Sequence, residues 1–299
     1  MAAGITDVLN INDMIGTIIA ESVIKFQKVN VMWSLMRKKQ AMKGANTVLF
    51  PILTIPTEAD VDANASGAEE TTATMTKLDS TGVSLEILRY AISVGLTDLS
   101  SDGSAEDMIN IASSAVGNAL SQKFDNLACA LGDGFATSVG SDTLNITLAM
   151  FFDAVGTLKA ANAPTFSNGN YAAILHPKQI WGAYGITNFL GAVINPIDKT
   201  NELLGSGYVT TLAGCDIFWS SEIPLASNIA DGMVIGPEAL GVAWKDMGGN
   251  GSFLAIEAQR EALTASTNIV GNGYFAVKEL VDTYGVQLQS LIVAEAEED

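Results

Sequence analysis

Residues 56–82, PTEADVDANASGAEETTATMTKLDSTG, are the stretch that most restricts how this chain can fold. They contain no aromatic residue and are rich in Thr, Ala, Asp and Glu, so they cannot build a hydrophobic core of their own. Extended apolar segments flank them at residues 47–55 and 83–96. Because a loop this long is unusual inside a compact domain, we predict a long hairpin over residues 46–97 that projects from the body.

The returning arm of this hairpin changes its alternation part-way along. Val83, Leu85 and Ile87 share one phase, and the apolar residues from Leu88 onward continue in the opposite phase. A change of phase in a strand is typical of an extra, unpaired residue. The pattern therefore predicts a β-bulge at residues 87/88.

Residues 104–132 carry the strongest helical pattern in the chain. Ser104 and Asp107 form an imperfect capping box before the helix, and Gly132 and Gly134 end it. At 1.5 Å per residue, we predict a rod roughly 40 Å long. Its continuous small and apolar face consists of Met108, Ile111, Ala112, Ala115, Val116, Ala119, Phe124, Leu127, Ala128 and Leu131.

The first 45 residues are predicted to form an N-terminal arm that extends from the body. An apolar stripe at i, i+3, i+4 spacing predicts an amphipathic helix over residues 11–29, and a basic segment, 37–43, follows before a break at Gly44. A short helix with so long an apolar stripe is typical of a segment that docks on something else.

Helices and strands alternate in the rest of the chain, which places the fold in the α+β class. We predict helices near residues 148–161 and from Pro177 onward. Strands are expected at residues 171–176, 214–220, 232–236, 239–245, 252–263, 269–281 and 284–293.

The composition favours extensive contact between subunits. Charged residues make up 16% of the chain and hydrophobic residues 48%, whereas ordinary soluble domains carry about 25% charged residues. No apolar run approaches the ~18–20 residues that span a bilayer, and the N-terminus lacks the early positive charge of a signal peptide. We therefore expect no membrane association, and we expect the apolar excess to be buried against partner subunits.

The net charge of −18 is unevenly distributed. Residues 1–43 hold six basic and three acidic side chains, whereas the remaining residues hold nine basic and 30 acidic ones. The body should therefore repel nucleic acid, and contact with DNA should be at most non-specific. The pattern leaves open whether residues 37–43 face DNA, a neighbour or solvent.

His176, the only histidine, lies between the expected strand 171–176 and Pro177. Proline favours the first position of a helix, so His176 is expected to be an N-cap with a structural role. No nucleophile elbow, HExxH or CxxC motif, or Gly-rich phosphate loop occurs in the sequence. Cys129 and Cys215 lie far apart and are expected to be two buried thiols rather than a disulfide.

One acidic stretch partly matches a calcium loop. Asp60, Asp62 and Asn64 fit the first three ligand positions of an EF-hand, but Ala65 and Thr71 stand where glycine and glutamate are needed. A solvated loop is the better interpretation. The sequence therefore predicts no catalytic, cofactor-binding or metal-binding residue and no enzyme.

An ordered set of segments is similar to the major capsid proteins of tailed bacteriophages, the Hong Kong 97-type shell fold. The arm, the hairpin and the helix 104–132 resemble that family's N-terminal arm, extended loop and spine helix. AAILHPKQIWG (172–182), GCDIFWSSEIP (214–224) and GPEALGVAWK (236–245) resemble segments of its axial domain. NIVGNGYFAVKELVDTYGVQL (268–288) resembles the strands that run back into its peripheral domain.

The resemblance implies a division into an arm (1–45), an extended loop (46–97), a peripheral domain (98–147 with 262–299) and an axial domain (148–261). It implies a subunit that assembles in the host cytoplasm into hexamers and pentamers of a virion shell around double-stranded DNA. Scaffold, portal and cement proteins are possible partners, with any scaffold a separate protein or absent. Although Lys77 is the only lysine of 46–97, we expect no covalent cross-link.

Two other interpretations stay open at this point. An encapsulin-like compartment shell would share the fold and differ in what it encloses. An acidic hydrolase with a carboxylate dyad would instead be a small soluble oligomer with a substrate cleft.

Overall fold

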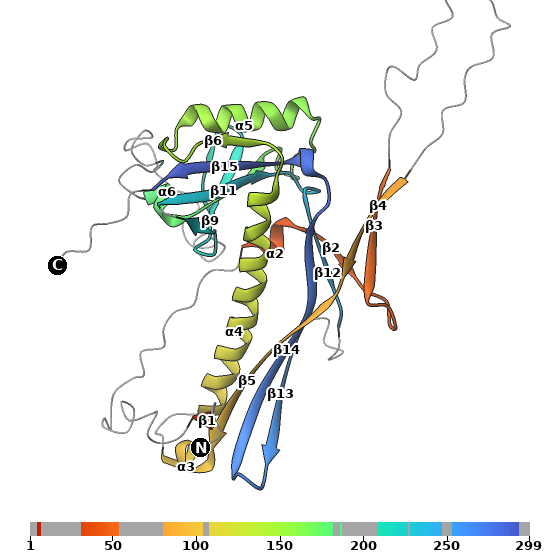
Figure 1. Cartoon of the computed structure of the whole chain (residues 1–299), viewed down its shortest axis with the longest axis vertical. Helices are drawn as coiled ribbons and strands as arrows, with labels where there is room; N and C mark the ends of the chain where they lie inside the picture. The colour runs from red at the N-terminus through yellow and green to blue at the C-terminus, as the bar shows by residue number, and fades with distance from the viewer. Residues whose placement is uncertain are drawn as a thin grey trace, which may run out of the picture.

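The computed structural model describes residues 5–6, 31–53, 80–103, 108–181, 186, 208–226, 228–246 and 253–292. The expected helix over residues 11–29, the partial calcium motif and Lys77 lie outside these residues. The described part is elongated, with one sheet beneath α5 at one end and a long helix beside a second, narrow sheet extending away from it (Figure 1).

A six-stranded sheet forms the elongated half of the molecule. Its order is β1–β5–β14–β12–β2, and β13 pairs with β14. The long strand β14 connects the sheet, because it pairs antiparallel with β5, β12 and β13. The strands are β1 (Ile5–Thr6), β2 (Arg37–Gln40), β5 (Leu88–Thr97), β12 (Leu240–Trp244), β13 (Leu254–Glu261) and β14 (Ser266–Glu279).

Helix α4, Met108–Cys129, lies along this sheet (Figure 1). Residues at every fourth position from Met108 to Ala128 are buried, including Leu120, whereas Ala115 of the predicted face is exposed. Gly271 of β14 lets the helix approach, since a Cβ there would lie 2.3 Å from Val116 Cγ1. The predicted glycine end is confirmed, because α4 tightens into the 3₁₀ helix η3, Ala130–Gly134. The start predicted at Ser104 lies outside the described residues.

A seven-stranded sheet forms the other half. Its order is β6–β15–β11–β7–β9–β8, with β10 beside β11. Helix α5 (Leu148–Ala160) packs on it and buries Phe151 and Leu158, and α6 (Pro177–Trp181) follows β7. These two helices and the predicted strands are confirmed. The strands are β6 (Ser138–Gly140), β7 (Tyr171–Leu175), β8 (Tyr208–Leu212), β9 (Cys215–Trp219), β10 (Leu225–Ala226), β11 (Ile229–Ile235) and β15 (Gly285–Leu291).

The base of the predicted hairpin is a two-stranded ribbon of β3 (Thr47–Leu53) and β4 (Ser80–Glu86), which diverges from the body (Figure 1). The expected bulge is not present. Instead the strand breaks at Ile87, whose N–H donates to Asn46 O at 2.8 Å. The phase changes there because β4 pairs with β3 while β5 pairs with β14, so the chain leaves one sheet and enters another.

Residues 31–43, assigned by sequence to an arm that docks elsewhere, pack on their own chain. Helix α2, Met32–Leu35, buries Met32 and Leu35 against α4, and β2 pairs in parallel with β12. The last part of the predicted arm is therefore anchored on its own subunit. A run of arginine and lysine carries no apolar alternation, so the strand arises only from tertiary pairing.

The described chain passes between the two sheets three times. These connections are residues 134–138, 235–240 and 279–285, which we call the waist. Sheet membership does not follow the expected boundaries at 147 and 261. β12 and β13 pair within the six-stranded sheet, whereas β6 and β15 belong to the seven-stranded sheet.

Candidate assembly surfaces

His176 lies where the sequence predicts, between β7 and α6. Its Nδ1 accepts a hydrogen bond from Lys178 N–H at 3.1 Å, and its own backbone N–H donates to Gln179 Oε1 at 2.9 Å. The Gln179 amide in turn donates to Ala230 O and to Ser290 Oγ. These contacts confirm that His176 is an N-cap, and they tie the start of α6 to the seven-stranded sheet.

The two cysteines are free, buried thiols, as predicted. Burial raises the pKa of Cys215 to about 12, and burial also raises the pKa of Cys129. Thiols held in this neutral state are poor nucleophiles and poor metal ligands. Within the described ranges, no three His, Cys, Asp or Glu side chains are grouped so that they could hold a metal ion.

Asp125 is a buried charged group that the sequence analysis missed. Its Oδ1 accepts from Met32 N–H at 2.9 Å, and its Oδ2 accepts from Ser220 O–H at 3.0 Å. Burial is the largest influence and raises its pKa, while these hydrogen bonds lower it. The side chain joins α2, α4 and the segment after β9. No local pattern could have identified it, because its partners lie 93 and 95 residues away in sequence.

The basic segment makes contacts within its own chain. Arg37 Nη1 lies 3.0 Å from Glu238 Oε1, and Lys38 Nζ lies 4.8 Å from the centre of the Trp33 ring. Lys39 donates to Leu49 O at 2.7 Å. These three side chains are exposed but already engaged. They therefore hold β2 against β12, α2 and the hairpin base.

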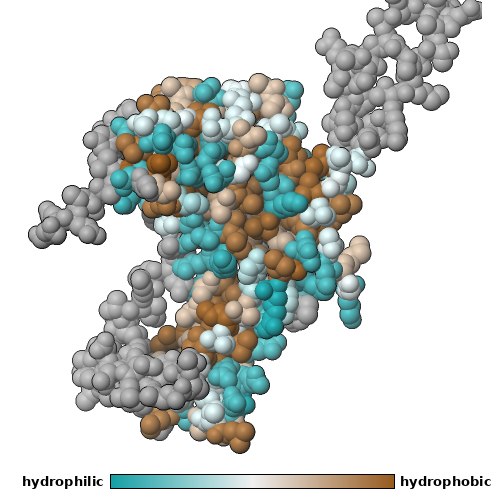
Figure 2. Space-filling view, viewed as in Figure 1, coloured by the Kyte–Doolittle hydropathy of each residue, from teal (hydrophilic) through white to brown (hydrophobic). Residues whose placement is uncertain are grey.

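Large apolar side chains remain exposed at several places in the described structure: the three sets given below, and also Ile109, Trp181, Leu225 and Ile256. Figure 2 shows hydrophobic colour over the hairpin base, along part of α4 and at the far end of the six-stranded sheet. At the hairpin base, a groove of about 630 Å³ is lined by Leu88, Tyr90 and Leu131 among others. The exposed sets are Met42, Leu49 and Leu88 at the hairpin base, Leu99 and Leu263 at the far end, and Leu144, Leu148 and Phe152 on and before α5.

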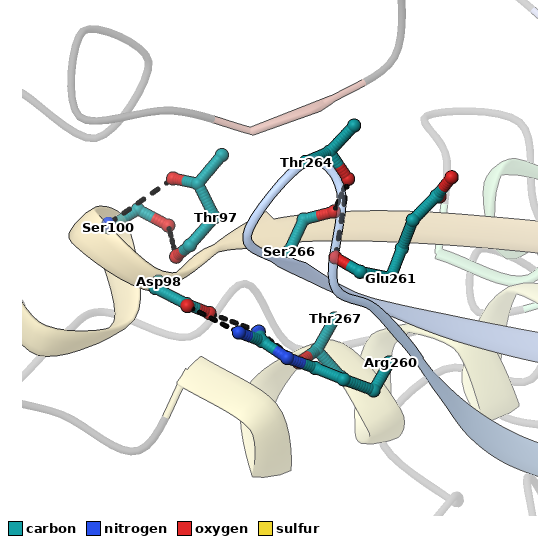
Figure 3. Close-up of polar contacts among 8 residues, drawn as sticks. All are labelled: Thr97, Asp98, Ser100, Arg260, Glu261, Thr264, Ser266 and Thr267. Atoms are coloured by element: carbon teal, nitrogen blue, oxygen red, sulfur yellow. Dashed lines mark hydrogen bonds and ion pairs between the residues drawn. The ribbon is translucent and has the colours of Figure 1, made fainter.

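The far end of the six-stranded sheet is held in shape by polar contacts (Figure 3). Arg260 forms a bidentate ion pair with Asp98, the first residue of α3 (Asp98–Gly103), and Nη2 lies 2.6 Å from Oδ2. The hydrogen bond from Arg260 lowers the pKa of Asp98. Asp98 N–H donates to Ala265 O at 2.9 Å in the β13–β14 turn. Leu263 in that turn is 97% exposed, so the ordered end presents an apolar side chain outward.

The described residues form an elongated body (Figure 1) with large apolar side chains exposed on its surface. The Hong Kong 97-type capsid fold is present: a spine helix along a narrow sheet, a second mixed domain and an extended loop.

Solved structures of shell proteins match nearly the whole chain. The capsid structure of the cyanophage P-SCSP1u matches with a TM-score of 0.68 at 16% identity, over 96% of this chain and 95% of that one. The head structure of Helicobacter pylori bacteriophage KHP40 matches with a TM-score of 0.66 at 13% identity, over 96% and 97%. The holo-SrpI encapsulin complex of Synechococcus elongatus matches with a TM-score of 0.63 at 13% identity, over 99% of both chains.

The comparisons of sequence identify no relative of this chain. No protein-family model and no curated protein matches this chain. Of the helices in the described ranges, none is both long and apolar enough to cross a membrane.

Proposed function

We propose that this chain is the structural subunit of the icosahedral shell that encloses the double-stranded DNA of a tailed phage. The observation that carries the proposal is the match of its fold, over almost the full length of both chains, to phage capsid and head structures. The large apolar side chains exposed at several separate places supply surfaces that an isolated subunit would leave in water. The function is assembly and not catalysis.

Sheet pairing supports a revised domain division. We propose an arm (1–45) whose last part anchors on its own chain, and an extended loop (46–86). The peripheral domain then comprises the six-stranded sheet and α4, and the axial domain comprises the seven-stranded sheet and its helices. Relative to the boundaries expected from sequence, this division moves β12 and β13 to the peripheral domain, β6 and β15 to the axial domain, and β5 from the extended loop to the peripheral domain.

Several partners follow from the proposal. Copies of the chain form hexamers and pentamers, and assembly takes place in the host cytoplasm with scaffold, portal and cement proteins as further partners. The net charge of −18 supports only non-specific contact with the packaged DNA, because an acidic wall releases a polyanion easily.

Negative-stain electron microscopy and light scattering of the purified chain test the proposal. Closed shells, or rings of five and six subunits, are the expected result. A monomer or dimer at every salt concentration, even with the lysate of its host added as a source of scaffold, would contradict it.

A surface variant makes the test specific. Leu263→Asp changes a side chain that is 97% exposed, so the subunit should fold normally while shell formation is lost or reduced. Glu257→Gln, an exposed substitution on β13, is the matched control and should assemble normally. If Leu263→Asp assembles normally, the far end of the six-stranded sheet does not contribute to the contacts between subunits.

An encapsulin-like compartment is the second candidate, supported by the match over 99% of both chains to the encapsulin complex. The contents of purified particles separate the two. Nuclease-protected double-stranded DNA supports the phage shell, and a stoichiometric protein cargo supports the compartment.

A further inference from the structure

One buried carboxyl group, that of Asp125, joins three parts of the chain. It lies on α4 with 1% of its surface exposed. Its Oδ1 accepts from Met32 N–H at 2.9 Å at the start of α2, and its Oδ2 accepts from Ser220 O–H at 3.0 Å. Because α4 lies along the six-stranded sheet and Ser220 follows β9 of the seven-stranded sheet, Asp125 links both halves to residues 31–36, which we call the arm root.

The serine on the far side of this link is itself firmly held. Ser220 has no exposed surface, and its N–H donates to Leu175 O at 3.1 Å at the end of β7. Its Oγ accepts from Glu222 N–H at 3.2 Å, and Cys129 Sγ lies 3.7 Å away. Ser220 is therefore fixed by the body of the protein, and it fixes the carboxyl group of Asp125 in turn.

The remaining contacts of the arm root are mostly apolar. Val31 and Met32 are buried, and the Trp33 ring is stacked on Phe253 with the ring centres 4.6 Å apart. Apolar burial is not directional, so these contacts favour docking without setting one exact position. A hydrogen bond is directional, and a buried N–H that loses its acceptor costs free energy. The bond from Met32 to Asp125 therefore determines where the arm root sits.

The residues after the arm root are held by exposed contacts. All four side chains of β2 are exposed, so this strand adds no buried apolar surface. The ion pair of Arg37 with Glu238 is about half exposed, and such pairs contribute little to stability. Gly44 follows with a φ of +90° and open space around it. Gly44 can thus serve as the hinge about which residues 31–41 swing.

We propose that Asp125 is a latch for residues 31–41, and that this segment opens and closes as one unit when the latch is released. Without an acceptor, the buried N–H of Met32 is satisfied only by water, so the open form is favoured. Opening of the arm root then takes β2 with it, because the chain is continuous and β2 has no buried side chain of its own.

Hydrogen–deuterium exchange of the full-length, unassembled chain tests the latch. In Asp125→Ala, protection should fall by about tenfold to a hundredfold at the Met32 amide. It should fall by the same factor at the Ala41 amide, which donates to Trp244 O at 2.8 Å and does not touch Asp125. Amides in α5 should be unaffected, which separates release of the segment from global unfolding.

Two matched variants make the result specific. Asp125→Asn keeps an oxygen for Met32 N–H and places an N–H toward Ser220 Oγ, so most of the protection at Met32 and Ala41 should return. Asn126→Ala changes the next position of α4, which is exposed, and should leave both amides as they are in the wild type.

Trypsin provides a second measurement. Arg37, Lys38 and Lys39 are exposed but lie in a paired strand, so cleavage requires the strand to open. The rate of cleavage then follows the population of the open form. Products that begin at residues 38–40 should form faster from Asp125→Ala, whereas Asp125→Asn should resemble the wild type.

The latch is refuted if Asp125→Ala loses protection at Met32 alone, since the carboxyl group is then only a local cap. It is also refuted if Asp125→Asn loses as much protection as Asp125→Ala. Should Asp125→Ala fail to fold, Ser220→Ala replaces it and removes only the hydroxyl donor to Oδ2. Protection at Met32 and Ala41 should then fall less, but still by equal factors, and unequal factors would refute the latch.

The latch also has a consequence for assembly, which rests on the proposed function whereas the latch itself does not. In a shell subunit, Asp125 fixes the point at which the residues before Val31 reach the body. Asp125→Ala should therefore give irregular particles in electron microscopy. If the wild-type chain forms no shell while both amides respond as predicted, the proposed function is refuted and the latch stands.

Discussion

The two sheets of this protein differ in how deeply they are buried. In the seven-stranded sheet, β7 is buried along its whole length, and β11 is buried from its second residue onward. In the six-stranded sheet, β14 alternates between buried and half-buried residues over most of its length, and six of the eight residues of β13 are exposed. One half therefore has an enclosed core, whereas the part of the other half where β5 pairs with β14 depends on the contact of that sheet face with α4.

Removing a large side chain from the enclosed core should have the largest effect. Phe151→Ala on α5 deletes a ring with no exposed surface, and we expect a loss of about 3–5 kcal/mol in the free energy of unfolding. Chemical denaturation of the unassembled chain measures it. A loss no larger than that of the glycine substitution described next would mean that this core is less tightly packed than its burial indicates.

Phe152→Ala is the control on the adjacent position of the same helix. Its ring is 58% exposed, so the free energy of unfolding should change little. If α5 contributes to contacts between subunits, Phe152→Ala should weaken assembly while Phe151→Ala weakens folding.

The helix-to-sheet contact of the narrow half should break with one added methyl group. In Gly271→Ala, the new Cβ would lie 2.3 Å from Val116 Cγ1 and 2.9 Å from Leu120 Cδ1, so α4 has to move outward. We expect a loss of about 1–3 kcal/mol from overpacking. Increased amide exchange in α4, with α5 unchanged, would show that the damage stays in this half.

Gly156→Ala is the matched glycine control. This position lies on the exposed face of α5 with open space around it. Alanine favours a helix over glycine, so we expect a gain of about 0.5–1 kcal/mol. A destabilised Gly156→Ala would show that glycine substitution, and not the close helix contact, explains the result at Gly271.

The smallest effect is expected at the far end of the narrow half. Arg260→Gln removes the exposed ion pair with Asp98. The melting temperature should fall slightly at low salt, and the difference should vanish at high salt or when acid protonates Asp98, whose pKa lies below 3.8. A large difference that persists in high salt would mean that the turn is held by more than charge.

Periodicity predicted the parts of the fold whose burial repeats along the chain. Most of the α4 face, the strands β7, β9 and β11 to β15, and the cap at His176 all have a local pattern that the structure confirms. The break at Ile87 was visible as a change of phase, but a phase change alone cannot tell a bulge from a move between sheets.

Contacts between distant residues could not be predicted in this way. Strand β2 forms because Arg37–Gln40 pairs with β12, about 200 residues later, and nothing in its own composition favours a strand. Asp125 acquires its environment from Met32 and Ser220, which lie 93 and 95 residues away in the sequence. The assembly surfaces were predicted only as a general excess of apolar residues, because exposure depends on the finished fold.

The pairing of β5 with β14 has a consequence for synthesis. Thr97 is opposite Ser266, and Leu88 is opposite Phe275, so the first long strand of the narrow half has to wait for one of the last. At the ~5–20 residues per second of a ribosome, that wait is on the order of ten seconds or more. During it, the apolar face of α4 has no complete sheet to pack on. The nascent chain therefore exposes the apolar face of its long helix until translation is almost finished.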